Sequence, residues 1–137
     1  MYIDLDNFKT INDTHGHEVG DLLLKQVADR LLQSMRLSDT AARLGGDEFV
    51  VMLSDLNADL SDAKQKANTV AEKLLSSLNQ PYSIKGYSVR SSPSVGVTLF
   101  ADQRLGIDEI LRQADHAMYQ AKSAGRNTVR FFESAQS

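Results

Sequence analysis

Two adjacent glycines, two adjacent acids and an apolar run follow one another in the segment from Arg43 to Leu53. Glycine adopts positive φ without steric cost, so Gly45-Gly46 favours a tight hairpin turn whose backbone a ligand can approach closely. Asp47 and Glu48 then stand at the start of the returning strand, where alternation sends neighbouring side chains to opposite faces. We therefore expect a β-hairpin with an acidic tip. At most one of its two acids can easily share a site with a given neighbouring residue. Such a tip either faces solvent or holds a divalent cation.

The elements around this hairpin alternate between strand and helix. Apolar residues recur at helical spacing in three stretches, which are predicted as helices at about 19–35, 60–78 and 107–121. Strands are expected at 1–5, 40–44, 48–54, 94–100 and 128–132, with a small separate hairpin at 82–84 and 87–89. The stretch 6–17 is rich in Asp, Asn and Gly, which is typical of a loop.

This order predicts an α/β (α+β) fold. Setting the small hairpin aside, the first six elements follow the β-α-β-β-α-β order of a ferredoxin-like, palm-type core, in which a central, mostly antiparallel sheet carries flanking helices. A further helix and strand complete one domain over residues 1–132, and residues 133–137 form a frayed tail. The acidic tip is then expected at a sheet edge, near the C-terminal end of the first strand.

The composition excludes several classes of function. The net charge of −3 provides no basic field for a nucleic-acid partner. The absence of cysteine rules out disulfides, thiolate metal sites and cysteine nucleophiles, and it suits a reducing cytoplasm. No apolar run approaches the roughly 20 residues that span a bilayer. We therefore expect a cytoplasmic domain without a signal peptide or a membrane segment.

Two aspartates from different elements are candidate ligands for a hard cation. Asp4 ends the first strand and Asp47 follows the glycine turn, so the expected topology brings their carboxylates together. Carboxylate oxygens and a backbone carbonyl suit magnesium when phosphate oxygens complete its octahedron. Taken singly, Asp4 and Asp6 are acids of the kind that faces solvent at a strand end.

Two further pairs of polar residues admit a structural and a ligand-binding interpretation. Lys122 and Arg126 lie four residues apart at the end of a predicted helix, where cations complement the helix dipole. Asn12 suits a turn and Asp21 a first helical turn. An amide and a carboxylate together can also match the edge of a guanine base by hydrogen bonding.

Seven segments, spread in order over nearly the whole chain, carry a family pattern. They are Asp4–Asp13, His15–His17, Gly20-Asp21, Arg43–Phe49, Ser94–Val97, Ala114–Lys122 and Gly125–Asn127. In order and in spacing, this pattern resembles the GGDEF domain of diguanylate cyclases.

The resemblance implies a reaction and a metal. GGDEF domains condense two GTP molecules into cyclic di-GMP and two pyrophosphates, and two domains face each other so that each 3′-hydroxyl attacks the other's α-phosphorus. By position, Asp4, the Leu5 carbonyl and Asp47 would ligate Mg²⁺, or Mn²⁺ in its place. The metal would polarise the α-phosphate and lower the pKa of the 3′-hydroxyl.

The remaining positions of the family's site also have counterparts. Asp47, Glu48 and Lys9 match catalytic positions, and the role of Glu48, in metal binding or in deprotonation, stays open. Substrate-binding positions are matched by Phe8, Asn12, Asp21, Gly45, Gly46, Lys122 and Arg126. The resemblance implies that Asn12 and Asp21 bind the guanine base. It also implies that Lys9, Lys122 and Arg126 contact the phosphates.

A regulatory site is implied by Arg36-Leu37-Ser38-Asp39. This RxxD pattern lies shortly before the glycine turn, at the position of the family's product-inhibition site. Arg36 would stack on and hydrogen-bond the guanine of cyclic di-GMP, and Asp39 would bind the base edge. The family adds a basic residue from the next helix, for which Lys64 and Lys66 are the candidates.

The chain also departs from the family. GGDEF domains open with a loop and helix carrying an Asp-x-Leu-Thr-Gly-Leu-x-Asn-Arg pattern, which this sequence does not contain. We therefore expect an N-terminally truncated domain whose exposed apolar surface favours a homodimer. Its parent protein is expected to carry sensory or phosphodiesterase domains.

Three alternatives to a working cyclase remain. The chain could be a catalytically inactive module that binds GTP or cyclic di-GMP, or a truncated domain that serves only interaction. A polymerase-like nucleotidyltransferase shares the core and the paired carboxylates. The spacing of the glycine hairpin and the acidic pI make this last alternative the weakest.

Overall fold

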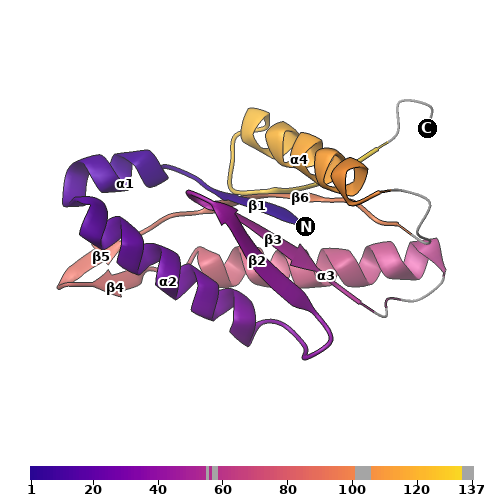
Figure 1. Ribbon diagram of the computed structural model, residues 1–137, viewed down its shortest axis with the longest axis horizontal. Coiled ribbons are helices and arrows are strands. Elements are labelled where there is room, and N and C mark those ends of the chain that lie inside the picture. Colours follow the sequence, from indigo (N-terminus) through magenta and orange to yellow (C-terminus); the bar gives the residue numbers. More distant parts are fainter. Residues whose placement is uncertain (55, 57–58, 101–105, 134–137) are drawn as a thin grey trace.

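The computed structural model describes residues 1–54, 56, 59–100 and 106–133. In this part of the chain, a five-stranded sheet carries helices on both faces, and a two-stranded hairpin lies apart from it (Figure 1). The strands are β1 (Tyr2–Leu5), β2 (Thr40–Gly45), β3 (Glu48–Met52), β4 (Tyr82–Ile84), β5 (Tyr87–Val89), β6 (Pro93–Val97) and β7 (Val129–Phe131). The helices are α1 (Phe8–His15), α2 (His17–Gln33), α3 (Leu60–Leu78) and α4 (Ile107–Ser123).

The order of the strands confirms the predicted fold class. The sheet runs β2-β3-β1-β6-β7, and its neighbours are antiparallel except for β6 and β7. The β2–β3 hairpin carries the glycine turn at one edge, as predicted. Its register places Glu48 opposite Asp4, so the acidic tip lies beside the C-terminal end of β1.

The expectation of a loop over 6–17 is wrong, because residues 8–15 form α1. This helix starts after Asn7, which has a φ of 62°, and it stops at Gly16, which has a φ of 91°. Ile11 is its one buried residue, so the sequence shows no apolar face. Packing against α2 supplies the stability that weak local propensity does not reveal.

The other elements lie close to their predicted ranges. The bounds of α3 and of the β4–β5 hairpin are as predicted, whereas α2 starts at His17 rather than near residue 19. Strand β3 stops at Met52, short of residue 54, because the Ser54 amide donates to the Asp39 carboxylate. Strand β6 stops at Val97, short of residue 100. Residues 134–137 of the expected tail lie outside the described residues.

Side-chain alternation in β1 divides the core between the two faces of the sheet. Ile3 and Leu5 join the main hydrophobic cluster with α2 and α3. Tyr2 packs on the opposite face, against Ala114 and Met118 of α4. Asp4 shares the face of Tyr2, so the pleat of the strand presents its carboxylate to α4.

Helix α4 approaches β6 closely because Gly96 has no side chain. A Cβ at this position would lie 2.1 Å from the carbonyl oxygen of Ala114 and 2.2 Å from the amide nitrogen of Met118. The predicted close backbone approach at Gly96 is therefore confirmed. This close approach sets the distance between α4 and the sheet, and it thereby brings Lys122 within reach of β1.

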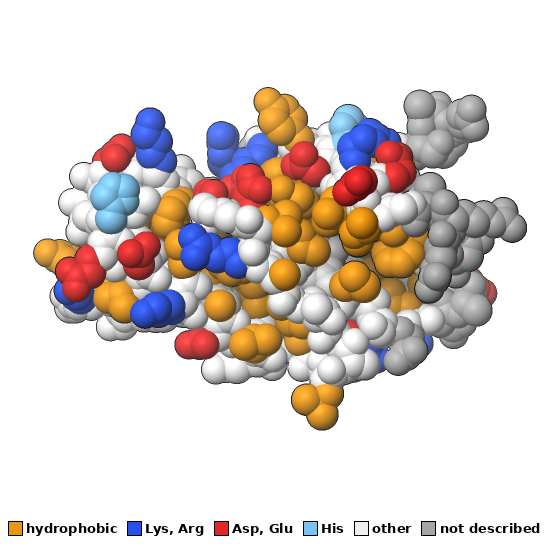
Figure 2. Space-filling model, viewed as in Figure 1, with side chains coloured by type: hydrophobic (Ala, Val, Ile, Leu, Met, Phe, Trp, Pro, Cys, Tyr) orange, Lys and Arg blue, Asp and Glu red, His pale blue; other side chains and the backbone are white. Residues whose placement is uncertain are grey.

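Apolar side chains remain exposed on the β2–β3 hairpin. Leu44 is 49% and Met52 41% exposed. Figure 2 shows hydrophobic side chains on the viewed face between α4 and this hairpin, with charged side chains of both signs above them. In the described residues, no helix is both long enough and apolar enough to cross a bilayer.

Candidate functional site

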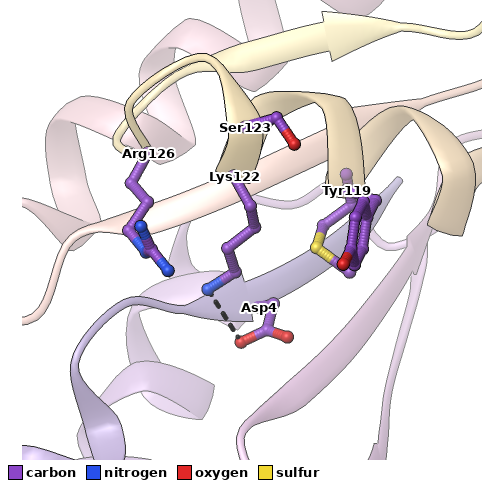
Figure 3. A pocket seen from close by; sticks show the side chains of 6 residues that line it. Asp4, Tyr119, Lys122, Ser123 and Arg126 are labelled. Atoms are coloured by element: carbon purple, nitrogen blue, oxygen red, sulfur yellow. Dashed lines mark ion pairs between the residues drawn. The ribbon is translucent and has the colours of Figure 1, made fainter.

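A cavity of about 390 Å³ lies beside the C-terminal end of β1, next to the last turns of α4. Its lining residues are Asp4, Met118, Tyr119, Lys122, Ser123 and Arg126 (Figure 3). Lys122 and Arg126 both point towards Asp4. The structure thus brings together three residues that the family resemblance assigns to one site, two cations and one acid.

Asp47 lies close to Asp4, as the sequence predicts. The Leu5 amide donates to the Asp47 carbonyl oxygen at 3.2 Å. The pKa of Asp4 is raised to about 6: burial raises it most, the Lys122 ammonium group opposes that effect, and the Asp47 carboxyl group raises it further. Two carboxyl groups that disfavour each other's charge are typical of a site that holds a cation.

Glu48 also lies beside Asp4, which differs from the expectation that alternation sends the two tip acids to opposite faces. The glycine turn consists of Gly46 and Asp47, so Asp47 precedes the strand and alternation does not separate the pair. Glu48 faces Asp4 across the β1–β3 ladder, and the Tyr2 hydroxyl donates to its carboxylate at 2.5 Å. Tyr2 therefore fixes the second acid, a contact that the sequence analysis missed.

Asp6 is 1% exposed, so it is not a solvent-facing acid. Its carboxylate accepts hydrogen bonds from Ser92 Oγ at 2.6 Å, Ser94 Oγ at 2.7 Å, Lys122 Nζ at 2.9 Å and the Asn127 amide at 3.1 Å. Burial favours a higher pKa, but these hydrogen bonds outweigh it and lower the pKa of Asp6. Asp6 is thus the charged centre that ties β1 to β6 and to the end of α4.

Asn12 has the one buried side-chain atom in the described residues that lacks a hydrogen-bond partner, its Oδ1. This oxygen lies against Gly20, where an added Cβ would be only 1.8 Å away, and the ring of Phe8 borders the same space. A buried acceptor without a partner is costly unless a ligand or water satisfies it. The position suits an amide that receives a hydrogen bond from a base.

The other predicted site residues, Lys9, Asp21, Gly45 and Gly46, are exposed. Lys9 is in the first turn of α1, and Asp21 follows Gly20 on α2. Gly46 has a φ of 50°, and a Cβ on either glycine of the turn would meet no atom within 4 Å. The turn is held by a hydrogen bond from Arg43 Nε to the Gly46 carbonyl at 2.9 Å, and its surface is open to a ligand.

A second cavity, of about 410 Å³, contains Arg36 of the RxxD pattern. The other residues that line it are Leu56, Asp62, Gln65, Lys66, Thr69 and Val70. Lys64 lies elsewhere, with its ammonium group 5.4 Å from the centre of the Phe131 ring. Of the two basic candidates from α3, Lys66 is the one that shares a cavity with Arg36.

Asp39 is engaged within the RxxD turn itself. Its side chain is 4% exposed and accepts from the amides of Arg36 at 2.9 Å and Ser54 at 3.2 Å. Burial favours a higher pKa, but the hydrogen bonds from Arg36 and Ser54 lower the pKa of Asp39. Arg36 keeps an exposed guanidinium group that also donates to the Ser54 carbonyl. Asp39 therefore positions Arg36 in this structure.

The oxygens around Asp4 fit a hard cation. Lys122 Nζ lies 3.2 Å from Asp4 Oδ1 and 3.4 Å from the Leu5 carbonyl oxygen, so a cationic group already occupies the space between two of the predicted ligands. Oxygen-only donors are those that Mg²⁺ prefers. No three His, Cys, Asp or Glu side chains surround a common point in the described ranges. A metal here would therefore also take the backbone carbonyl and ligand oxygens.

Comparisons with known proteins point to one family over nearly the whole chain. The family described as "Diguanylate cyclase, GGDEF domain" matches residues 1–128. The bifunctional diguanylate cyclase/cyclic di-GMP phosphodiesterase MucR of Pseudomonas aeruginosa is 44% identical over an alignment of 137 positions that covers 98% of this chain. The chain spans only 19% of the length of that relative.

Solved structures share the fold over nearly the whole chain. The GGDEF domain of YfiN (TpbB) from Pseudomonas aeruginosa superimposes with a TM-score of 0.88 at 36% identity, covering 97% of this chain and 80% of that one. The GGDEF domain of DgcB from Caulobacter crescentus, solved in complex with cyclic di-GMP, gives a TM-score of 0.79 at 25% identity, with 97% and 76% covered.

Proposed function

Because this chain belongs to the GGDEF family of diguanylate cyclase domains, we propose that it condenses two GTP molecules into cyclic di-GMP and two pyrophosphates. The observation that carries this proposal is the meeting of Asp4 and Asp47 beside the cavity that Lys122 and Arg126 line. Paired acids suit a divalent cation, and facing cations suit the phosphates that the cation would bridge.

In this proposal the acids hold Mg²⁺, or Mn²⁺ in its place. Asp4, the Leu5 carbonyl and Asp47 would be its protein ligands. When bound, the metal would polarise the α-phosphate and lower the pKa of the attacking 3′-hydroxyl. Glu48, which the Tyr2 hydroxyl fixes beside Asp4, assists either in holding the metal or in taking the proton of that hydroxyl.

The nucleotide is held by residues of α1, of α2, of the end of α4 and of the β2–β3 hairpin. Lys122 and Arg126 at the end of α4, with Lys9 at the start of α1, contact the phosphates. Asn12 and Asp21 read the guanine, and the unpartnered Asn12 Oδ1 accepts from the exocyclic amine of the base. Phe8 and the open backbone at Gly45 and Gly46 provide the surfaces against which the base and the phosphates lie.

The reaction requires two copies of the domain, each with one GTP. Each 3′-oxygen forms a bond to the α-phosphorus of the other nucleotide, and the bond from that phosphorus to the β-phosphate oxygen breaks to release pyrophosphate. The exposed apolar side chains on β2 and β3 support a homodimer. We propose a cytoplasmic parent protein in which sensory or phosphodiesterase domains accompany this one, since the chain spans a small part of its relative.

Incubation with GTP and Mg²⁺, followed by chromatography, tests the proposal. We expect cyclic di-GMP from the unaltered chain and a rate at least about 100-fold lower from Asp47→Ala, because a lost metal contact removes several kcal/mol of transition-state stabilisation. Asp29→Ala is the matched control, since it removes an exposed acid of α2. Equal rates for all three chains would refute the assignment of Asp47.

We further propose that cyclic di-GMP binds in the Arg36 cavity and thereby inhibits the enzyme. Arg36 and Lys66 supply two cations for the phosphates and guanines of the product, and Asp39 holds Arg36 in place. Calorimetric titration with cyclic di-GMP is expected to show affinity about tenfold weaker for Lys66→Ala and unchanged for Lys64→Ala. Equal losses in both variants would place the product elsewhere.

A pure binding module is the second candidate function. The Arg36 cavity shares no lining residue with the Asp4 cavity, so product binding needs none of the catalytic acids. No cyclic di-GMP from GTP, together with saturable binding of cyclic di-GMP that Arg36→Ala abolishes, would establish this alternative.

A further inference from the structure

Lys122 places its ammonium group among oxygens from three consecutive residues. Its Nζ is 2.9 Å from Asp6 Oδ1, 3.2 Å from Asp4 Oδ1 and 3.4 Å from the Leu5 carbonyl oxygen. Two of these three oxygens belong to the residues proposed above to bind the metal. A lysine ammonium group and a divalent cation cannot both contact Asp4 and Leu5 at these distances without strong repulsion.

The two carboxylates hold the ammonium group unequally. The Asp6 side chain is 1% exposed and is fixed by two serine hydroxyls and by a backbone amide, so it cannot follow a moving lysine. The Asp4 side chain is 17% exposed, lines the cavity and makes the longer of the two contacts. The contact with Asp6 is therefore the permanent one, and the contact with Asp4 can be exchanged.

We propose that Lys122 is an internal stand-in for the metal, which leaves Asp4 and the Leu5 carbonyl when the cation binds and remains anchored on Asp6. This inference rests on the proposed function for the identity of the metal site. In the free protein, the lysine supplies the counter-ion for the neighbouring carboxylates of Asp4 and Asp47. It also makes the protein alone a poor metal binder, because each metal ion must first displace an ammonium group.

The nucleotide removes this competition. Phosphate oxygens in the cavity offer the displaced ammonium group a new partner within reach of Asp6. Metal and nucleotide therefore bind together, and neither free Mg²⁺ nor free Mn²⁺ loads the site efficiently. Arg126 lines the same cavity and faces Asp4, but it makes no ion pair with Asp4 in the described residues.

Binding of Mn²⁺ to the nucleotide-free chain tests the exchange. The free aqueous ion is measured by electron paramagnetic resonance during titration of the protein. We expect Lys122→Met to bind Mn²⁺ at least about tenfold more tightly than the unaltered chain, because one neighbouring charge typically shifts the pKa of a carboxylate by about one unit or more. Lys122→Arg retains the charge and is expected to bind Mn²⁺ as weakly as the unaltered chain.

Two controls separate this exchange from other effects. Arg126→Met removes a positive charge from the same cavity and is expected to change the Mn²⁺ affinity less than Lys122→Met does. Lys122→Gln, which retains a donor for Asp6, replaces Lys122→Met if circular dichroism shows that the methionine variant is unfolded. Mn²⁺ affinity that is unchanged or weaker in the folded neutral variant would overturn the proposal.

The outcome is independent of cyclase activity. Tighter Mn²⁺ binding by Lys122→Met in a chain that makes no cyclic di-GMP supports the exchange and refutes the proposed reaction. Cyclic di-GMP production by the unaltered chain, with no gain of Mn²⁺ affinity in the variant, supports the reaction and refutes the exchange.

Discussion

Replacing Asp6 by alanine is expected to destabilise the domain by about 3 kcal/mol. Removal of one partner from a buried ion pair typically costs about 3–5 kcal/mol, because the remaining charge is left uncompensated. Lys122 is 20% exposed and retains Asp4 as a second partner, so its ammonium group recovers part of its stabilisation. The two serines and the Asn127 amide also lose their acceptor. The remaining contact between Lys122 and Asp4 reduces the loss and the three donors without an acceptor increase it, so we place the loss at the lower end of that range rather than below it.

Urea and thermal unfolding measure this loss. Single domains unfold with about 5–15 kcal/mol, and each kcal/mol lowers the Tm of a domain of this size by roughly 2–4 °C. We therefore expect a folded variant whose Tm is about 10 °C lower. Asp29→Ala removes an exposed acid and is expected to change the free energy of unfolding by less than about 0.5 kcal/mol.

The loss is also expected to depend on pH. The pKa of Asp6 in the folded chain lies below its ordinary value, since hydrogen bonds from Lys122 and the serines outweigh burial. A carboxyl group with a lowered pKa stabilises the fold above its unfolded pKa of roughly 3.9, and the contribution disappears as the pH falls through the folded pKa. The difference between the two chains should therefore shrink below about pH 4.

A loss of less than about 1 kcal/mol at pH 7 would refute this reasoning, because it would mean that the four hydrogen bonds add nothing beyond what water supplies. A difference that stays constant from pH 7 to pH 3 would refute the role of the charge. In that case packing alone would explain the loss.

Three further substitutions test other contacts. Gly96→Val is expected to abolish folding by circular dichroism, because its Cβ would lie 2.1 Å from a backbone carbonyl oxygen that cannot move aside; a folded variant would contradict this. Gly20→Ala is expected to fold but to bind a non-hydrolysable GTP analogue about tenfold more weakly by calorimetry. The added Cβ would lie 1.8 Å from Asn12 Oδ1 and would force the Asn12 side chain to move; unchanged affinity would remove Asn12 from the guanine site. Arg30→Met is expected to lose about 2–3 kcal/mol in urea unfolding, because the guanidinium group bonds three backbone carbonyl groups and stacks 3.7 Å from the Tyr82 ring; an unchanged midpoint would show that these bonds contribute nothing.

Local patterns were sufficient for the sheet and for most of the helices. The β2–β3 hairpin and the helical face of α3 each depend on local spacing, which the sequence displays directly, although the turn lies at Gly46-Asp47 and so one residue later than predicted. Helix α1 could not be predicted in this way, because it buries only Ile11 and depends on α2 for its stability. The pairing of Asp4 with Asp47 followed from topology and was confirmed.

Contacts between distant residues could not be predicted from local patterns. Nothing next to Asp6 in the sequence distinguishes it from Asp4, since its partners are 86 to 121 residues away. The choice between Lys64 and Lys66 depends on the direction of two side chains of α3, which the structure alone supplies. The roles of Lys9 and Asp21 remain predictions, whereas the Asp47→Ala and Mn²⁺ experiments above test the metal ligands.

The anchoring of Lys122 and Asn127 on Asp6 has a consequence for synthesis on the ribosome. Asp4 and Asp6 leave the ribosome before the lysine that neutralises them, which comes more than one hundred residues later. A nascent chain that lacks the end of α4 has all the carboxylates but not this internal counter-ion. The nucleotide-binding end of the domain is therefore completed only after α4 has been translated, so that a chain terminated before Lys122 cannot form the site.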